Sequence, residues 1–432
     1  MHAFDGLELL APADEPAAVA RWREQARELL AELGLPGRHE EHWRRADLRF
    51  LAAAARGSGA ADAQPVERPA RLAPLRAGIH LCFDRGRFAS EFGQLLHDAA
   101  VRVARLSAAR PEDEPSPATL ASHRGLVGDL RLALLSRAAG ADGAQLVVRR
   151  GCTPSRPLVL EHIGAGGGPA TAHVSHRLCV EPGASAILVE FYDDRSSAES
   201  ALLGDVTIEL GAASRLLHLR LVAPTHRAQL VDTLRVDVDR DAEYDQRTLA
   251  AAAGALRSTQ AIGLRGDGAR AVLHAGAFVR DGADVDLRLL AEHGADATHS
   301  VQTVHLLAAR GRATVDSEVV VPPGRRRVRS RQSLRAVLLE PGCDVALRPR
   351  LAIRSDDVDS RHGATTSALP QDQLFYLRSR GLDSTQARRL LVSAHLRQVF
   401  PTTGDQALDS LVHGLLQAAL DRSLPEPGGA AR

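Results

Sequence analysis

His362 is the side chain of this sequence with the clearest capacity for chemistry. It stands beside Arg361 and Gly363, shortly after the acidic pair Asp356-Asp357. A neutral imidazole is a common metal ligand, and its charge changes near physiological pH, so a histidine in such a motif is a candidate ligand. The alternative is that His362 only satisfies backbone groups at the place where a β-structure ends. The residues alone leave both interpretations open.

The other candidate groups near the C-terminus favour structural roles. Asp356 and Asp357 could act as a carboxylate pair, but adjacent residues on a strand point to opposite faces, which favours solvation of a strand end. Cys343 lies in the turn Pro341-Gly342-Cys343-Asp344 and is interpreted as an ordinary surface thiol. The wide spacing of the cysteines argues against a disulfide framework and a self-contained zinc or iron–sulfur site; they are Cys82, Cys152, Cys179 and Cys343.

Composition excludes several classes of function. All 54 basic residues are arginines, so the chain has no P-loop lysine and no lysine base, and any ATP hydrolysis must come from another subunit. The net charge of +1 predicts no overall attraction to nucleic acid or to an anionic membrane. The basic run Arg325–Arg331 is interpreted as a solvated turn, with binding of an anion or an acidic partner as the alternative. Without a signal peptide or an apolar run of ~18 residues, a cytoplasmic protein is expected.

The middle of the chain reads as short strands separated by small-residue turns. Turns such as Glu181-Pro182-Gly183-Ala184 and Arg265–Ala269 recur about 28 residues apart, a repeat length that suits a solenoid. No long helices lie between the strands, so the choice is between a β-sandwich and a parallel β-helix, and the regular repetition favours the β-helix. Examples of the expected strands are Ala144–Val148, Ser185–Phe191, Thr207–Leu210, Arg215–Leu221, Leu234–Val238, Val272–Phe278, Asp284–Leu290, Thr314–Val321 and Ala346–Ile353.

Helical periodicity flanks this region on both sides. It is assigned to residues 1 to about 52, most clearly Ala17–Leu33, and to Ser122–Ala139, while Gly78–Phe88 reads as two short strands around a turn. Polar or Gly/Pro-rich linkers are expected at 52–74 and 110–117. After Pro370 the pattern predicts three helices: Gln371–Arg380, Ser384–Phe400 with Asp383 as N-cap, and Asp405–Leu420. The expected domains are therefore 1–140, mainly helical, 141–366, a β-helix, and 367–432, helical.

Several C-terminal motifs occur together in one known family. They are Asp356-Asp357-Val358, His362-Gly363-Ala364-Thr365, Asp372-Gln373-Leu374-Phe375-Tyr376-Leu377-Arg378 and Arg380-Gly381-Leu382. In this order and spacing they resemble the C-terminal signature of the SufB/SufD family, scaffold proteins of Suf-type iron–sulfur cluster assembly. A weaker N-terminal motif, Leu35-Pro36 followed by Trp43, is similar to that family as well. Within the family the chain is more similar to SufD than to SufB.

The resemblance implies a fold and a set of partners. The fold is a right-handed parallel β-helix between helical domains, which pairs with a SufB-like subunit. The C-terminal helices are implied to dock a SufC-like ABC ATPase, and an isolated chain could form a homodimer. His362 is implied to act at the SufB–SufD interface, where a transient iron–sulfur cluster is built, with no cofactor held stably by this chain alone. The expected ATPase contacts are Phe375, Tyr376, Arg380, Leu382, Leu390 and Leu391.

One departure from the family pattern concerns the metal chemistry of this motif. Where many SufD sequences carry a cysteine two residues before the histidine, this chain has Ser360. A soft thiolate is the preferred ligand of iron in a sulfide cluster, and a serine hydroxyl is a poor one. Either the partner supplies the thiol, or the site around His362 no longer ligates a cluster directly.

Two classes of function remain to be separated. The first is a non-enzymatic scaffold subunit of the Suf complex. The second is a β-helix enzyme, either a polysaccharide lyase, which needs clustered acids and a basic proton abstractor, or an acyltransferase, which needs strict hexapeptide repeats. Neither of those patterns is visible in the sequence, so the scaffold is the favoured interpretation.

Overall fold

A computed structural model of the chain describes most of its residues. These are residues 17–37, 39–40, 43–45, 78–89, 98–106, 127–140, 142–164, 170–194, 200–223, 228–252, 254–280 and 282–423. The linkers expected at 52–74 and 110–117 lie outside the described residues. Among the described residues, no helix is long and apolar enough to cross a membrane.

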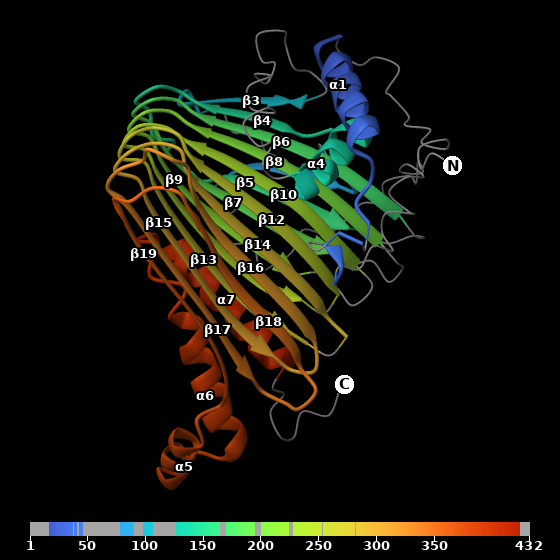
Figure 1. Ribbon diagram of the computed structural model, residues 1–432. Coiled ribbons are helices and arrows are strands. Elements are labelled where there is room, and N and C mark those ends of the chain that lie inside the picture. Colours follow the sequence, from blue (N-terminus) through green and yellow to red (C-terminus); the bar gives the residue numbers. More distant parts are fainter. Residues whose placement is uncertain are drawn as a thin grey trace.

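The described chain forms a β-solenoid of about seven coils with helices at both ends, which confirms the predicted fold class (Figure 1). Each coil contributes one strand to each of two facing sheets. Sheet A has the spatial order β19 (Val358–Ala368), β17 (Val328–Leu338), β15 (His299–Ala308), β13 (Arg270–Val279), β11 (Glu243–Ala252), β9 (Arg215–Ala223), β7 (Ser185–Asp194), β5 (Leu158–Gly164), β1 (Ile79–Asp84) and β2 (Arg87–Phe88). Sheet B has the order β18 (Asp344–Ile353), β16 (Arg312–Val321), β14 (Asp284–His293), β12 (Ala255–Leu264), β10 (Ala228–Val238), β8 (Ser200–Leu210), β6 (Ala170–Val180), β4 (Ala144–Val148) and β3 (Val101–Arg105).

The repeat length follows from the register of parallel strands. The row Arg215, Glu243, Arg270, His299 and Arg329 joins residues 27 to 30 positions apart on successive strands of sheet A. This agrees with the predicted spacing of about 28 residues.

Small residues at the corners allow the coils to stack closely. The turns that lead into β7, β9, β11, β13, β15 and β17 place residues in the left-handed region, among them Gly183, Asp241 and Gly268 at φ angles of 71°, 56° and 75°. The turns bond to one another, because the amide of Gly183 donates to Ala212 and the amide of Gly268 donates to Asp296. Glycine adopts this backbone without strain, which explains its recurrence in the sequence.

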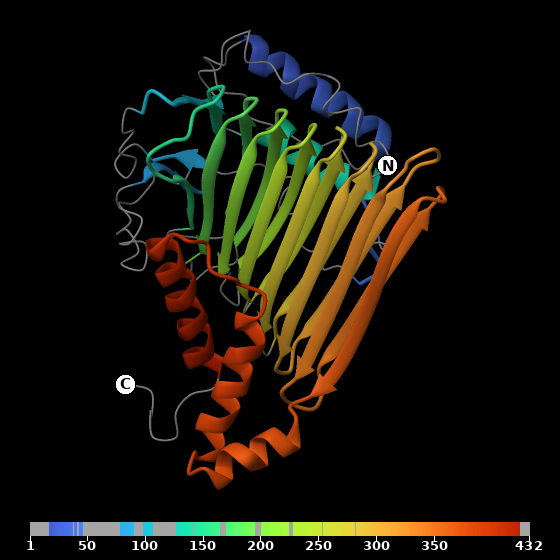
Figure 2. The same ribbon diagram turned by 90° about the vertical axis from the view of Figure 1, so that its left-hand side faces the viewer.

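Alternation along the strands divides the side chains between an interior and two outer faces. Leucine, valine and alanine side chains fill the space between the sheets, as the low aromatic content predicts. The outer face of sheet B is covered by α1 (Ala17–Leu33) and α4 (Val127–Ala139), with Trp43 fully buried beneath them. The outer face of sheet A is covered in part by α6 (Ser384–Arg397) and α7 (Gln406–Ser423), as Figure 2 shows.

Several elements differ from their predictions. Helix α1 ends at Leu33, and Gly34 at φ 73° follows it, as its sequence position predicts. The helical prediction for residues 1 to about 52 is wrong at the described residues 34–37, which form an irregular segment, and its part beyond Arg45 lies outside the described residues. The motif from Val358 to Ala368 is a full strand, β19, and not only the end of the β-region. Strands β3, β5, β6, β11, β12, β15 and β17 were not among the examples singled out from the sequence.

The two ends of the solenoid are built differently. At the N-terminal end, β2 pairs antiparallel with β1 and β3 pairs antiparallel with β4, so both sheets finish in reversed strands. At the C-terminal end, β18 and β19 are the last strands of their sheets, and each has a neighbour on one side only among the described residues. Helix α5 (Gln371–Ser379) leaves from this open end and projects away from the solenoid (Figure 1).

Candidate functional site

The open C-terminal end presents unpaired backbone groups along β19. In a parallel ladder each residue directs its N–H and C=O to one neighbouring strand, and the next residue directs them to the other. The amide of Arg329 donates to Thr298 beside β15 at 2.9 Å, and the amide of Val328 donates to Asp357 beside β19 at 3.2 Å. The odd-numbered residues of β19 therefore bond to β17, and the even-numbered residues direct their backbone groups to the free edge. His362 and Ala364 belong to this free set.

The side chain of His362 lies at the end of an interior row. Parallel registers align it with Gln332, Gln302, Leu273 and Gln246 on the strands beneath. These four side chains are buried between the sheets, each with at most 2% of its surface exposed. His362 is exposed, since no further coil covers it. Its imidazole forms no hydrogen bond or ion pair with the described residues, so the alternative role in satisfying backbone groups is not supported.

The groups around His362 are polar but do not form a closed site. The Ser360 hydroxyl contacts the Ser330 hydroxyl of the preceding coil. Asp356 and Asp357 lie in the turn before β19 and not on a strand, so the argument from strand alternation does not apply to them, and both are exposed. Among the described residues, no group of three or more histidine, cysteine or acidic side chains could hold a metal ion. This chain alone therefore offers one imidazole at its open end.

A second exposed feature lies on the helices that follow β19. Within the described part of the chain, three large hydrophobic side chains are exposed: Phe375 at 74%, Tyr376 at 56% and Leu390 at 50%. All three were singled out from the sequence, and they belong to α5 and α6. Arg380 stacks on Tyr376, with its guanidinium carbon 5.2 Å from the ring centroid. These exposed apolar side chains therefore lie on two consecutive helices.

The other two sequence candidates are less accessible. Leu382 and Leu391 are half-buried, and Leu391 packs against the cluster that joins α6 and α7 to sheet A. Asp383 caps α6 as predicted, because its carboxylate accepts the amide of Gln386 at 2.8 Å. The cap fixes the start of α6 and leaves Leu390 on the exposed side.

Helix α6 is fastened to the solenoid by specific contacts. The Arg388 guanidinium donates to the carbonyl of Leu339 at 2.9 Å. The imidazole of His305 on β15 bonds to the carbonyl of His395 at 3.0 Å, and the two rings stack 4.5 Å apart. These contacts hold α6 to sheet A.

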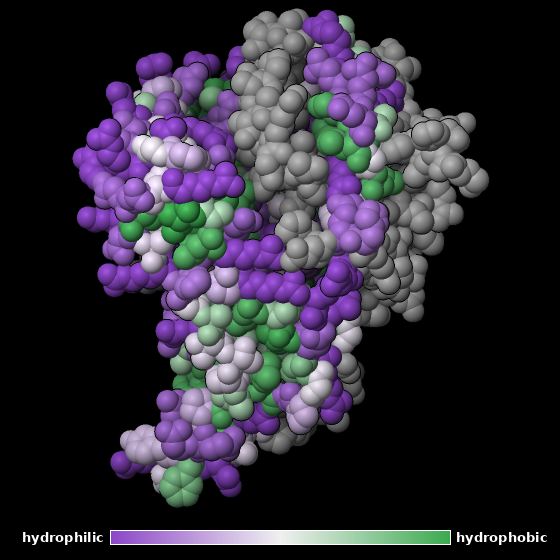
Figure 3. Space-filling view, in the orientation of Figure 1, coloured by the Kyte–Doolittle hydropathy of each residue, from purple (hydrophilic) through white to green (hydrophobic). Residues whose placement is uncertain are grey.

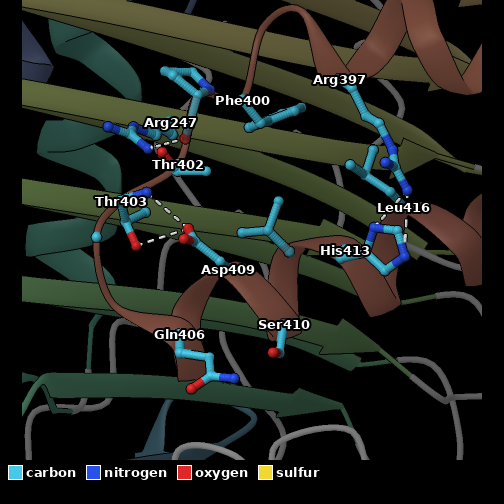
Figure 4. Close-up of a pocket in the computed structure, with 13 residues that line it drawn as sticks. Arg247, Arg397, Phe400, Thr402, Thr403, Gln406, Asp409, Ser410, His413 and Leu416 are labelled. Carbon is cyan, nitrogen blue, oxygen red and sulfur yellow. Dashed lines mark hydrogen bonds between the residues drawn. The ribbon is translucent and has the colours of Figure 1, made fainter.

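The loop between α6 and α7 encloses a hollow of about 610 Å³ against sheet A (Figure 4). Arg247 from β11 reaches into it and donates to the carbonyl of Pro401. The Asp409 carboxylate accepts the amide and the hydroxyl of Thr403 at 2.7 and 2.8 Å, which holds the loop in place. These bonds explain how the helices are anchored.

A buried ionic network inside the solenoid was not predicted from the sequence. The Arg220 guanidinium lies 2.7 Å from the carboxylate of Glu190 and 2.7 Å from that of Asp232. His218 lies 3.2 Å from Glu190 and bonds to the Tyr244 hydroxyl at 2.9 Å. Burial alone would raise the pKa of Glu190, but Arg220 and His218 hold that pKa well below its usual range. The sequence signal for this network is the presence of charged residues at inward-facing positions of otherwise apolar strands.

Comparisons with known proteins agree with this geometry. Residues 162–395, more than half of the chain, match the family model described as SUF system FeS cluster assembly, SufBD core domain. The chain is 25% identical to the iron–sulfur cluster assembly protein SufD of Escherichia coli K12, over 94% of this chain and 93% of that protein. It is 35% identical to the chloroplastic protein ABCI7 of Arabidopsis thaliana over 31% of this chain and 29% of that protein. It is 37% identical to the SufBD family protein slr0076 of Synechocystis over 20% of this chain and 19% of that protein.

Proposed function

Since the chain belongs to the SufBD family of iron–sulfur cluster assembly, we propose that it is a non-enzymatic scaffold subunit with two docking surfaces. The first is the free edge of β19, which receives a SufB-like subunit. The second is the exposed part of α5 and α6, which receives a SufC-like ATPase. The observation that carries the proposal is the open C-terminal end of the solenoid, together with the exposed helices that start from it.

The free edge supports pairing with a second solenoid. An unpaired strand is a template for strand addition, in which backbone hydrogen bonds supply affinity. β19 offers 11 residues and β18 offers 10, on two sheets that end together. A partner with a similar end would continue both sheets and the interior between them.

Pairing of this kind would enclose His362 between two subunits. The rows beneath it are buried because the next coil covers each of them. An imidazole enclosed between two solenoid ends is available to ligate iron of a nascent cluster, which is the cargo of the complex. Because this chain has Ser360 where a thiol would be expected, we propose that the partner supplies the sulfur ligands.

The helical surface supports docking of the ATPase. Phe375, Tyr376 and Leu390 leave apolar area in contact with water that a partner would bury, at about 25 cal/mol per Å² before the costs of association. Clusters of exposed aromatic side chains beside an arginine are typical centres of protein–protein contacts. The contacts of α6 with Leu339 and β15 would carry a nucleotide-driven movement from this surface to the open end.

Strand addition at β19 is tested with the substitution Ala364→Pro. The backbone N–H of Ala364 faces the free edge, so proline removes a donor for the partner and no bond to β17. We expect the variant to melt within a few degrees of the wild type and to lose co-purification with a co-expressed SufB-like subunit. If the variant still pairs with the SufB-like subunit as well as the wild type does, the proposed edge contact is wrong.

The matched control is Thr365→Pro, one residue further along the same strand. Its N–H belongs to the set that bonds to β17, so this proline breaks an internal hydrogen bond, worth about 1 kcal/mol, and loosens the strand itself. The control therefore lowers thermal stability, whereas Ala364→Pro does not. Equal losses of stability in both variants would contradict the assignment of the free edge.

The ATPase surface is tested with the double substitution Phe375→Ser and Tyr376→Ser. Both side chains are exposed, so we expect no loss of stability and at least a tenfold weaker affinity for a SufC-like ATPase, while pairing with the SufB-like subunit persists. Deletion of the residues after Pro370 should abolish ATPase binding. ATPase binding that survives the deletion would place the contact elsewhere on the chain.

A further inference from the structure

The outer face of sheet A carries a group of positive side chains beside the edge strand β19. Arg270 on β13, His299 on β15 and Arg329 on β17 are direct neighbours in the parallel register, and they are called the basic row below. Adjacent strands lie about 4.8 Å apart, so these side chains stand side by side. Arg331 and Arg361 form a second such pair two residues further along.

The chain does not neutralise the basic row. Of the acidic residues at its two ends, Glu243 contacts Arg215 at 3.5 Å and Asp359 contacts Arg361 at 3.3 Å. The side chains of Arg270 and Arg329 form no ion pair with a described carboxylate, and Arg270 contacts only the His299 ring at 3.5 Å. In the register Arg270 stands next to Glu243 and Arg329 next to Asp359, but both carboxylates contact other arginines, so the two guanidinium groups are available to an added anion.

The basic row lines a hollow of about 660 Å³. Thr298, Arg327 and Asp357 complete it from the neighbouring turns. The volume is that of a small-molecule site, and an extended acidic segment would need a longer groove. Hydrophilic side chains gather along the left-hand edge of the molecule in Figure 3, where these turns lie. With Asp359 held by Arg361, the lining keeps an excess of positive charge.

The positive charges around the hollow affect the pKa of His299, which lines it. Burial lowers the pKa of His299, and the neighbouring charges of Arg270, Arg329 and Arg331 lower it further. Asp357 and Asp359 lie across the hollow from this ring. The imidazole is therefore a neutral hydrogen-bonding group between two permanent cations, an arrangement suited to an oxyanion.

We propose that this hollow binds a small phosphate-bearing anion between the guanidinium groups of Arg270 and Arg329. A guanidinium presents a planar fork of donors that matches two phosphate oxygens, and two forks on alternate strands can hold one phosphoryl group from both sides. His299 lies between them and contributes a ring nitrogen. The site uses outward side chains and not the free backbone groups of β19, although Asp359 on β19 lines it.

The test is calorimetric titration of the full chain with sodium pyrophosphate at constant ionic strength. We expect saturable binding by the wild type and at least about fivefold weaker binding by Arg329→Gln, because one of two charge-assisted forks is lost. The matched control is Arg326→Gln, an exposed arginine of the same turn that does not line the hollow; its affinity should stay within about twofold of the wild type.

Thermal stability gives an independent readout. Without ligand, Arg329→Gln should melt close to the wild-type temperature, because the side chain is exposed and forms no ion pair with a described carboxylate. Pyrophosphate should raise the melting temperature of the wild type and of Arg326→Gln, but not that of Arg329→Gln. Equal affinities for Arg329→Gln and the wild type would overturn the proposal. So would the absence of saturable pyrophosphate binding, or saturable binding of an oligoglutamate peptide in its place, which would indicate an acidic partner.

Discussion

Arg220 offers the sharpest test of how the solenoid tolerates charge in its interior. Its guanidinium bridges Glu190 and Asp232 at 2.7 Å each, donates to Ser258 at 3.2 Å, and has no exposed surface. Methionine has a similar volume and no charge, so Arg220→Met removes the bridge without leaving a large cavity. Two buried carboxylates then face each other with no cation between them.

The expected cost follows from the protonation that this loss would force. To remain buried at pH 7.5, at least one carboxylate must take up a proton, and for a group of ordinary pKa near 4.3 this costs about 4 kcal/mol. Direct measurements of broken buried ion pairs fall at about 3–5 kcal/mol. We therefore expect the free energy of unfolding of Arg220→Met to fall by about 4 kcal/mol, measured by urea denaturation at pH 7.5.

The pH dependence of the difference distinguishes this explanation from a packing defect. On acidification the solvent supplies the proton, so the deficit of Arg220→Met should shrink by about 1.4 kcal/mol per pH unit between pH 7 and pH 5. The triple variant Glu190→Gln, Arg220→Met and Asp232→Asn should recover most of the loss at pH 7.5, since no charge remains to be paired. A deficit that is the same at pH 5 and pH 7.5 would refute the electrostatic reasoning.

Three further predictions use other parts of the molecule. Burial lowers the pKa of His176 and His293 to about 4, so from pH 6.5 down to 4 only the unfolded chain gains these protons. Each should then reduce the free energy of unfolding by about 1.4 kcal/mol per pH unit, and a constant urea midpoint at pH 7, 6 and 5 would contradict this. A Cβ at Gly276 would lie 2.7 Å from the Phe400 ring, so Gly276→Val should loosen α6 and α7 and speed their proteolysis, while the solenoid melts unchanged. His362→Ala should leave stability within about 0.5 kcal/mol of the wild type, since the ring is exposed, but should lower the cluster content of the assembled complex; unchanged cluster content would remove His362 from the proposal.

The sequence predicted the architecture because the repeat was visible at the corners. Corner motifs such as Glu181-Pro182-Gly183-Ala184 need one left-handed residue and one small buried residue, and both requirements restrict residue type strongly. The exposed side chains Phe375, Tyr376 and Leu390 were also singled out, because the family resemblance implied contacts on these helices. The position of an individual side chain within its coil was harder to predict.

Features that depend on alignment between coils could not be read from one strand at a time. The basic row joins Arg270, His299 and Arg329, which are 29 and 30 residues apart and become neighbours only when the register is known. The same holds for His362, whose place at the end of a buried row depends on its alignment with Gln332. β19 itself was missed because its inward side chains are polar, so its pattern does not resemble a buried strand.

The polarity of β19 has a consequence for how the open end can be used. On β13 the inward positions are Ala271, Leu273, Ala275 and Ala277, all apolar and all covered by the next coil. The matching positions of β19 are Ser360, His362, Ala364 and Thr366, which water can solvate. An apolar open end with a free edge would aggregate, whereas a polar one is stable in water and can still form backbone hydrogen bonds with a partner. Such an interface gains less from hydrophobic burial than the coils beneath it, so it can open again without unfolding the solenoid. Reversible opening is the property that a scaffold needs if a cluster is to be built between two subunits and then released.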